Sequence, residues 1–191
     1  MEAKDFVDEL VARARKAQEE YEKFSQEQAD AIVRACAKAV YDNAEYLARL
    51  AVDETRMGVY EHKIQKNKGK ATVIWNSLKG KKSVGILSRN EETGITEIAR
   101  PVGVVGAVTP CTNPVVTPMC NAMFALKGLN AIIIGPHPRS KNTSYETVRL
   151  MNEAIAKLGA PKNLIQIIEE PTVELSSALM HAVDVVVATG G

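Results

Sequence analysis

The segment PVGVVGAVTPCTNPVVTP, residues 101–118, decides the fold class of this chain. Its first half holds an apolar run without alternating polar residues, which predicts a strand covered on both faces. Three more such runs follow, so that the four predicted strands are Val104–Val108, Ala131–Ile134, Leu164–Ile168 and Val183–Ala188. Segments rich in Met, Ala and Leu fill the gaps and predict helices over Val115–Lys127, Thr143–Leu158 and Val173–Ala182. This alternation predicts a doubly wound parallel α/β sheet of the Rossmann-like kind.

The residues before this segment have a helical period instead. Apolar residues recur every three or four positions in three successive stretches, and Ser25 and Gln28 have the spacing of a capping box at the start of the second. The third stretch is expected to end at Gly58, where a left-handed conformation would stop it. A longer, more polar helix is expected from Tyr60 to about Leu78.

Between the helices and the sheet lies a predicted β-hairpin. Two short strand-like runs, Val84–Leu87 and Ile95–Ile98, flank a turn-prone stretch. Such short strands need to pack against another element to be stable. We therefore divide the chain into a helical N-terminal segment (1–82), a hairpin (83–100) and an α/β domain (101–191).

Composition restricts the class of partner. The 191 residues carry a formal net charge of +1, with 46% hydrophobic and 25% charged residues, which is ordinary for a globular protein. Acidic and basic residues are interleaved, which argues against nucleic acid or a membrane surface and favours a small molecule. The densest basic stretch, Lys63–Lys82, carries apolar residues at helical spacing, and we interpret its lysines as a solvated helix face.

The cysteines point to a cytoplasmic location. Cys36, Cys111 and Cys120 are odd in number and lack the spacing of a zinc site, so no metal is expected. Nothing ahead of them resembles a signal peptide, and no apolar run reaches the roughly 18 residues that span a bilayer. Cys120 lies on an apolar predicted helix and Cys111 has no predicted base beside it, so neither is expected to be a nucleophile.

The chemistry of a doubly wound sheet lies beyond the carboxyl ends of its strands, where the strand order reverses. Four segments occupy those ends: Thr109–Pro114, Gly135–Arg139, Glu169–Pro171 and Thr189–Gly191. No GxGxxG motif follows the first strand, so the residue pattern by itself gives little support for a dinucleotide.

Two of these segments allow two interpretations each. The amide of Asn113 is placed to stabilise an oxyanion, or it simply caps the next helix. His137 and Arg139, held by Pro138 between them, are placed to meet a ribose, a phosphate or coenzyme A, or they form an ordinary polar loop.

A family resemblance extends over essentially the whole chain. Residues 101–106 with Thr109–Pro110 and Thr112–Pro114 resemble the aldehyde dehydrogenase superfamily. Residues 135–139, 159–165 and 188–191 are similar to its coenzyme-A-acylating branch. Segments at 25–28, 40–45, 57–61 and 113–123 are most similar to the members that act on succinate semialdehyde.

The resemblance implies a reversible reduction of an acyl-coenzyme A, expected to be succinyl-coenzyme A, to the aldehyde by NAD(P)H through a thioester on a catalytic Cys. It makes Asn113 the oxyanion-stabilising residue and assigns a cofactor pocket that coenzyme A shares. The implied pocket residues are Thr109, Pro110, Cys111, Thr112, His137, Pro138, Arg139, Gly190 and Gly191.

In this family the catalytic Cys and its supporting Glu come after the position that matches Gly191. We therefore expect the chain alone to bind cofactor without turnover. The hairpin matches an oligomerisation element, which implies a homo-oligomer. The alternative is a non-catalytic nucleotide- or coenzyme-A-binding module whose N-terminal helices form a partner surface.

Overall fold

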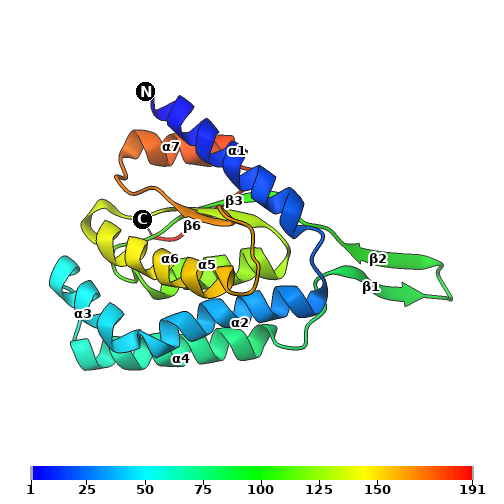
Figure 1. Ribbon diagram of the computed structural model, residues 1–191, viewed down its shortest axis with the longest axis horizontal. Helices are drawn as coiled ribbons and strands as arrows, with labels where there is room; N and C mark the ends of the chain where they lie inside the picture. The colour runs from blue at the N-terminus through cyan, green and yellow to red at the C-terminus, as the bar shows by residue number, and fades with distance from the viewer. Residues whose placement is uncertain (1, 191) are drawn as a thin grey trace.

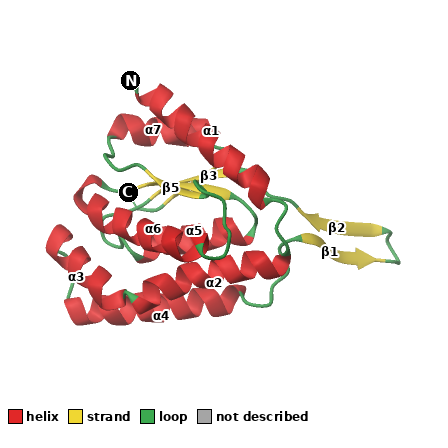
Figure 2. Ribbon diagram, in the orientation of Figure 1, coloured by secondary structure: helices red, strands yellow, loops and turns green. Residues whose placement is uncertain are grey.

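A computed structural model describes residues 2–190 as four layers (Figures 1 and 2). The N-terminal helices are α1 (Ala3–Tyr21), α2 (Gln26–Asp42), α3 (Ala44–Thr55) and α4 (Tyr60–Leu78). The hairpin strands are β1 (Gly85–Asn90) and β2 (Ile95–Ala99). The rest comprises β3 (Val104–Val108), α5 (Val116–Lys127), β4 (Ala131–Gly135), the short 3-10 helix η1 (Pro138–Ser140), α6 (Lys141–Ala156), β5 (Ile165–Ile167), α7 (Val173–Ala182) and β6 (Val185–Ala188).

The predicted doubly wound sheet is confirmed. Its four strands have the order β5-β4-β3-β6, and every neighbouring pair is parallel. Val105 is level with Ile132 on one side and with Val185 on the other, so β3 is the centre from which the chain winds both ways. The strand order therefore reverses between β3 and β6, and this is the switch point of the sheet.

Helices cover both faces of the sheet (Figure 1). Helices α1 and α7 lie on one face, α5 and α6 lie on the other, and α2 and α4 form a further layer outside α5 and α6. Helix α1 is tied to the sheet by buried polar bonds, since Gln166 Nε2 donates to the Leu10 carbonyl at 2.8 Å. Tyr21 is fully buried, and its hydroxyl donates to the Leu126 carbonyl at 3.0 Å. The first helix is thus part of the packing of the α/β layers.

Local signals in the N-terminal helices are largely confirmed. The capping box is present: Ser25 Oγ accepts from the backbone N–H of Gln28, and the Gln28 side chain accepts from the backbone N–H of Ser25. The expected end of the third helix at Gly58 is wrong. Helix α3 ends at Thr55, and the residue in the left-handed conformation is Arg56, with φ of 57°.

The fourth predicted strand differs from expectation in two ways. Strand β6 begins at Val185, two residues later than predicted, and the carboxylate of Asp184 before it accepts from the backbone N–H of Val104 at 2.8 Å. Val185 and Val186 are 38% and 40% exposed, so this strand is not covered on both faces in the described chain. It pairs with β3 on one side only.

The hairpin projects away from the four layers (Figure 1). Its two strands pair only with each other among residues 2–190, and Ile86, Ile95 and Ile98 are all exposed. In the same part of the chain, no helix combines the length and the apolar character needed to cross a membrane.

Candidate functional site

Two predicted site loops meet at the switch point of the sheet. The backbone N–H of Thr189 donates to the Val108 carbonyl at 3.0 Å, which continues the β3–β6 pairing into the loops. Gly190 has φ of 102°, and a Cβ built on it would lie 3.2 Å from the Cβ of Pro110. The close approach of the two loops therefore depends on a glycine at this position. Gly191, also predicted to bind cofactor, lies outside the described residues.

The side-chain hydroxyl of Thr109 is an unsatisfied polar group at the switch point of the described chain. The residue is 2% exposed, and its Oγ1 has no hydrogen-bond partner among residues 2–190. Its backbone N–H donates to the Gly135 carbonyl at 3.0 Å, which places the loop after β3 beside the loop after β4. A buried hydroxyl without a partner is costly, so this atom is a polar group of the switch point that the described residues leave unsatisfied.

The rest of the first loop lies against α3 and α4. Cys111 is buried, with Sγ 4.0 Å from Sδ of Met57, whereas Thr112 is exposed. Lys63 Nζ of α4 donates to the Thr112 carbonyl at 3.4 Å. Burial lowers the pKa of Lys63, and the nearby charge of Lys66 lowers it further.

The structure rejects the helix-cap interpretation of Asn113. Helix α5 begins at Val116, and no side chain accepts a capping hydrogen bond there. Asn113 is half-buried, its Oδ1 accepts a hydrogen bond from Lys66 Nζ, and its Nδ2 lies 3.3 Å from Thr112 Oγ1. The side-chain amide is therefore held in the loop by polar partners and does not serve the helix.

Two lysines of the Lys63–Lys82 stretch contact a loop: the interpretation as a solvated helix face is wrong for Lys63, which is partly buried, whereas Lys66 is exposed as expected. Lys63 and Lys66 are three residues apart, on one face of α4, and both contact the loop after β3. Their spacing was visible in the sequence, but nothing in it indicated that this face of α4 would meet a loop almost fifty residues later.

The loop after β4 is shaped by local hydrogen bonds. His137 Nδ1 accepts from the backbone N–H of Arg139 at 3.0 Å, and this starts the η1 turn at Pro138. His137, Pro138 and Arg139 are all exposed. Glu54 of α3 accepts from the backbone N–H of Asn142 at 2.9 Å and so fixes the start of α6 behind the loop. The exposed side chains are thus carried on a firmly anchored turn.

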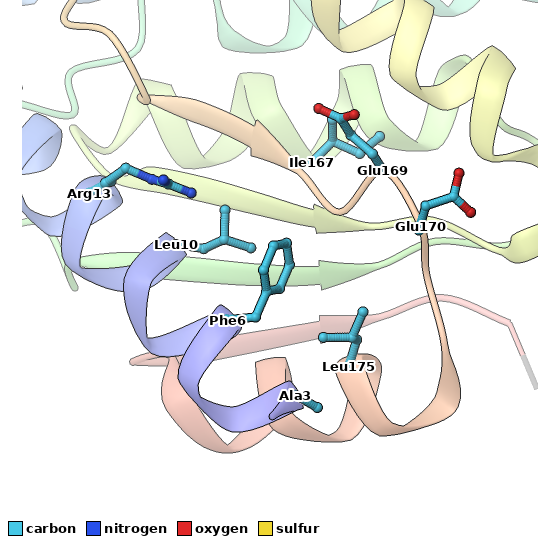
Figure 3. A pocket seen from close by; sticks show the side chains of 8 residues that line it. All are labelled: Ala3, Phe6, Leu10, Arg13, Ile167, Glu169, Glu170 and Leu175. Carbon is cyan, nitrogen blue, oxygen red and sulfur yellow. The ribbon is translucent and has the colours of Figure 1, made fainter. Parts of the chain in front are cut away.

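The third predicted segment lies beside the loop after β4 and away from the loop after β6, since Glu170 accepts a hydrogen bond from Lys141, two residues after Arg139. Glu169 and Glu170 follow β5, at the opposite edge of the sheet from β6, and line a hollow of about 570 Å³ between α1, β5 and α7. Figure 3 shows Phe6, Leu10 and Leu175 of the two helices around this hollow. It includes none of the residues predicted to bind cofactor.

Two cysteines are disfavoured as thiolates by burial. Burial raises the pKa of Cys36 to about 12 and also raises the pKa of the half-buried Cys120. Cys120 is more exposed than its apolar helix predicted. Within residues 2–190, no three His, Cys, Asp or Glu side chains gather into a possible metal-binding group.

The sequence of this chain matches a known protein family. Residues 1–191, the whole chain, match the aldehyde dehydrogenase family. The chain belongs to this family. The succinate-semialdehyde dehydrogenase (acetylating) of Clostridium kluyveri is 54% identical to this aldehyde dehydrogenase chain over 185 residues, which cover 97% of the chain and 41% of the relative.

Solved aldehyde dehydrogenase structures have the same fold. The acetylating aldehyde dehydrogenase of Geobacillus thermoglucosidasius superimposes with a TM-score of 0.93 at 39% identity, covering 97% of this chain and 41% of that one. The propionaldehyde dehydrogenase of Rhodopseudomonas palustris with bound CoA and an acylated Cys superimposes with a TM-score of 0.81 at 35% identity. The match covers 96% of this chain and 42% of that one. An engineered glycolyl-CoA reductase with bound NADP+ also superimposes with a TM-score of 0.81, at 34% identity, and the match again covers 96% of this chain and 42% of the other.

Proposed function

We propose that this chain is the cofactor-binding part of a coenzyme-A-acylating aldehyde dehydrogenase that acts on succinate semialdehyde. The reaction converts the aldehyde, coenzyme A and NAD(P)+ into the acyl-coenzyme A, NAD(P)H and a proton. The 54% identical relative is named for this aldehyde, and two of the similar structures contain coenzyme A or NADP+. The chain spans 41% of that relative, so the activity is proposed for the whole protein.

The observation that carries the proposal is the meeting of the loops after β3 and β6 at the switch point. Two features of this meeting support the proposal: Thr109 Oγ1 is buried without a partner among residues 2–190, and Gly190 lets the two loops approach closely at the switch point, where doubly wound sheets bind ligands. Thr109–Thr112, His137–Arg139, Gly190 and Gly191 are the residues that we propose hold the cofactor. When bound, the nicotinamide accepts or donates the hydride.

Asn113 is the proposed catalytic residue of this chain. When a nucleophile attacks the carbonyl, negative charge develops on its oxygen, and an amide N–H aimed at that oxygen stabilises the transition state. Removal of one such donor typically costs about 3 kcal/mol in the barrier. The nucleophile itself, a Cys that becomes a thioester, is proposed to lie outside these 191 residues.

The hairpin is proposed to pair with a second copy of the protein. Its strands expose Ile86, Ile95 and Ile98 and have no third strand beside them among the described residues. Short two-stranded hairpins are marginally stable without such a neighbour. The division into residues 1–82, 83–100 and 101–191 belongs to this proposal.

The test is the formation of NAD(P)H from succinate semialdehyde, coenzyme A and NAD(P)+, followed by absorbance. The whole protein, including any residues that follow Gly191, should turn over, and a chain ending at Gly191 should not. Turnover by the shorter chain would refute the placement of the nucleophile. If the whole protein binds NADH and coenzyme A without turnover, the non-catalytic binding module is the better description.

A further inference from the structure

The two ends of the Asn113 amide have opposite roles. Oδ1 can only accept hydrogen bonds and Nδ2 can only donate them, so the proposed stabilisation of an oxyanion requires Nδ2 to face the substrate. If the amide were rotated by half a turn, Oδ1 would face the developing negative charge and repel it. The neighbours of Asn113 therefore decide whether the residue helps or hinders the reaction.

Lys66 decides the orientation. Its ammonium group has three donors and no acceptor, so it can pair only with Oδ1 of Asn113, as it does in the structure. The other end, Nδ2, has a long contact of 3.3 Å with Thr112 Oγ1. Of its two hydrogens, one has no acceptor within residues 2–190.

Helix α4 is well placed to hold this lysine steady. Asn67, next to Lys66, is 3% exposed and donates to the Ala44 carbonyl of α3 at 3.2 Å. One turn earlier, Lys63 donates to the Thr112 carbonyl, and its Cε lies 3.0 Å from where a Cβ on Gly58 would be. Lys63 thus holds the backbone just before Asn113, and Lys66 holds the side chain of Asn113.

We propose that Lys66 is a positioning residue that acts through Asn113: it binds Oδ1, turns Nδ2 toward the reacting carbonyl and polarises the amide. This rests on the proposed role of Asn113 as oxyanion donor. Lys66 is itself exposed, and exposed polar pairs contribute little to folding. A merely structural lysine at this position would therefore change neither turnover nor stability by much.

The test is a series at position 66 in the whole protein, including any residues that follow Gly191. Lys66→Arg keeps a donor and should retain most of kcat. Lys66→Met offers neither donor nor acceptor and should lower kcat by on the order of 10-fold at unchanged KM for coenzyme A. Lys66→Glu offers an acceptor that attracts Nδ2 away from the substrate, so its kcat should fall further than that of Lys66→Met.

Lys68→Met is the matched control, because Lys68 is on the same helix and pairs with Glu45 at 3.2 Å instead of the loop. It should leave kcat unchanged. Thermal unfolding of every variant checks that the fold is retained, and Lys66→Glu keeps the test available if Lys66→Met fails to fold, because it too must lower kcat.

A double-mutant cycle separates this inference from the proposed function. In an Asn113→Ala background, Lys66→Met should cause no further loss of kcat. Equal loss in both backgrounds, or equal kcat for Lys66→Met and Lys68→Met, would overturn the positioning role while Asn113 stays catalytic. If Asn113→Ala alone retains full kcat, the oxyanion role fails, and the positioning role fails with it.

Discussion

Gly103 directly precedes the central strand β3, and its replacement by alanine should destabilise the fold severely. Its φ of 118° is a conformation that L side chains rarely adopt. A Cβ there would lie 2.3 Å from Asp184 Oδ2, so the Asp184 carboxylate would have to move. That carboxylate accepts from the backbone N–H of Val104 at 2.8 Å and from Arg15 at 2.9 Å.

The cost of Gly103→Ala can be worked out from these contacts. Backbone strain at such a φ costs about 1–3 kcal/mol. A buried N–H of Val104 left without its acceptor costs about 1–3 kcal/mol more. The half-exposed pair of Arg15 and Asp184 adds at most about 1 kcal/mol. The sum of about 2–7 kcal/mol is a large part of the 5–15 kcal/mol that typically stabilises a domain.

Thermal unfolding followed by circular dichroism measures this effect. For a chain of this size, Gly103→Ala should lower Tm by roughly 10 °C. Gly69→Ala is the matched control, because Gly69 lies inside α4 with open space where its Cβ would be. That change should raise stability by about 0.5–1 kcal/mol. A Tm for Gly103→Ala close to that of the parent would show that neither the φ of Gly103 nor the Asp184 contact constrains this position.

Three further predictions concern the switch point, α4 and β6. Gly190→Ala should weaken NADH binding about tenfold in a fluorescence titration, because of its positive φ and its contact with Pro110. The pKa of Lys63 is lowered by burial, so the folded chain loses that proton before the unfolded chain does. Stability should therefore rise with pH between the lowered pKa and the ordinary 10.5, and a urea-unfolding series should show no such rise in Lys63→Met. A product ending at Gly191 should self-associate through the exposed edge at Val185 and Val186, and a monodisperse monomer in light scattering would contradict this.

The sequence predicts the sheet well because its signals are local. A strand buried on both faces needs an apolar side chain at nearly every position, and Ala131–Ile134 shows this directly. The capping box at Ser25 and Gln28 is equally local, since both partners lie within one helical turn. The predicted fold class and the order of the elements follow from such signals.

The lysine contacts could not be predicted from the sequence because they depend on how distant elements pack. Lys63 and Lys66 reach Thr112 and Asn113 only because α4 docks beside the loop after β3. A lysine that faces solvent and a lysine that faces a distant loop have the same helical spacing. The exposure of β6 likewise depends on what lies beside it, and not on the apolar character of its residues.

The error at the end of α3 has a local cause. Gly58 is the residue that most readily adopts a left-handed conformation, and it does have a positive φ of 83°. The helix nevertheless ends earlier, at Thr55, whose hydroxyl donates to the Ala51 carbonyl and accepts from the backbone N–H of Met57. A side chain that competes for backbone hydrogen bonds thus ends the helix before the glycine.

We propose that the loops after β3 and β6 form one side of a dinucleotide site. An NMR titration of this chain with NADH, read from backbone amide shifts, tests it most directly. Saturable shifts at Thr109–Asn113 and at Gly190 are predicted. The claim would be contradicted if NADH caused no shifts, or if the shifts appeared instead around the hollow between α1 and α7, at Phe6 and Leu175.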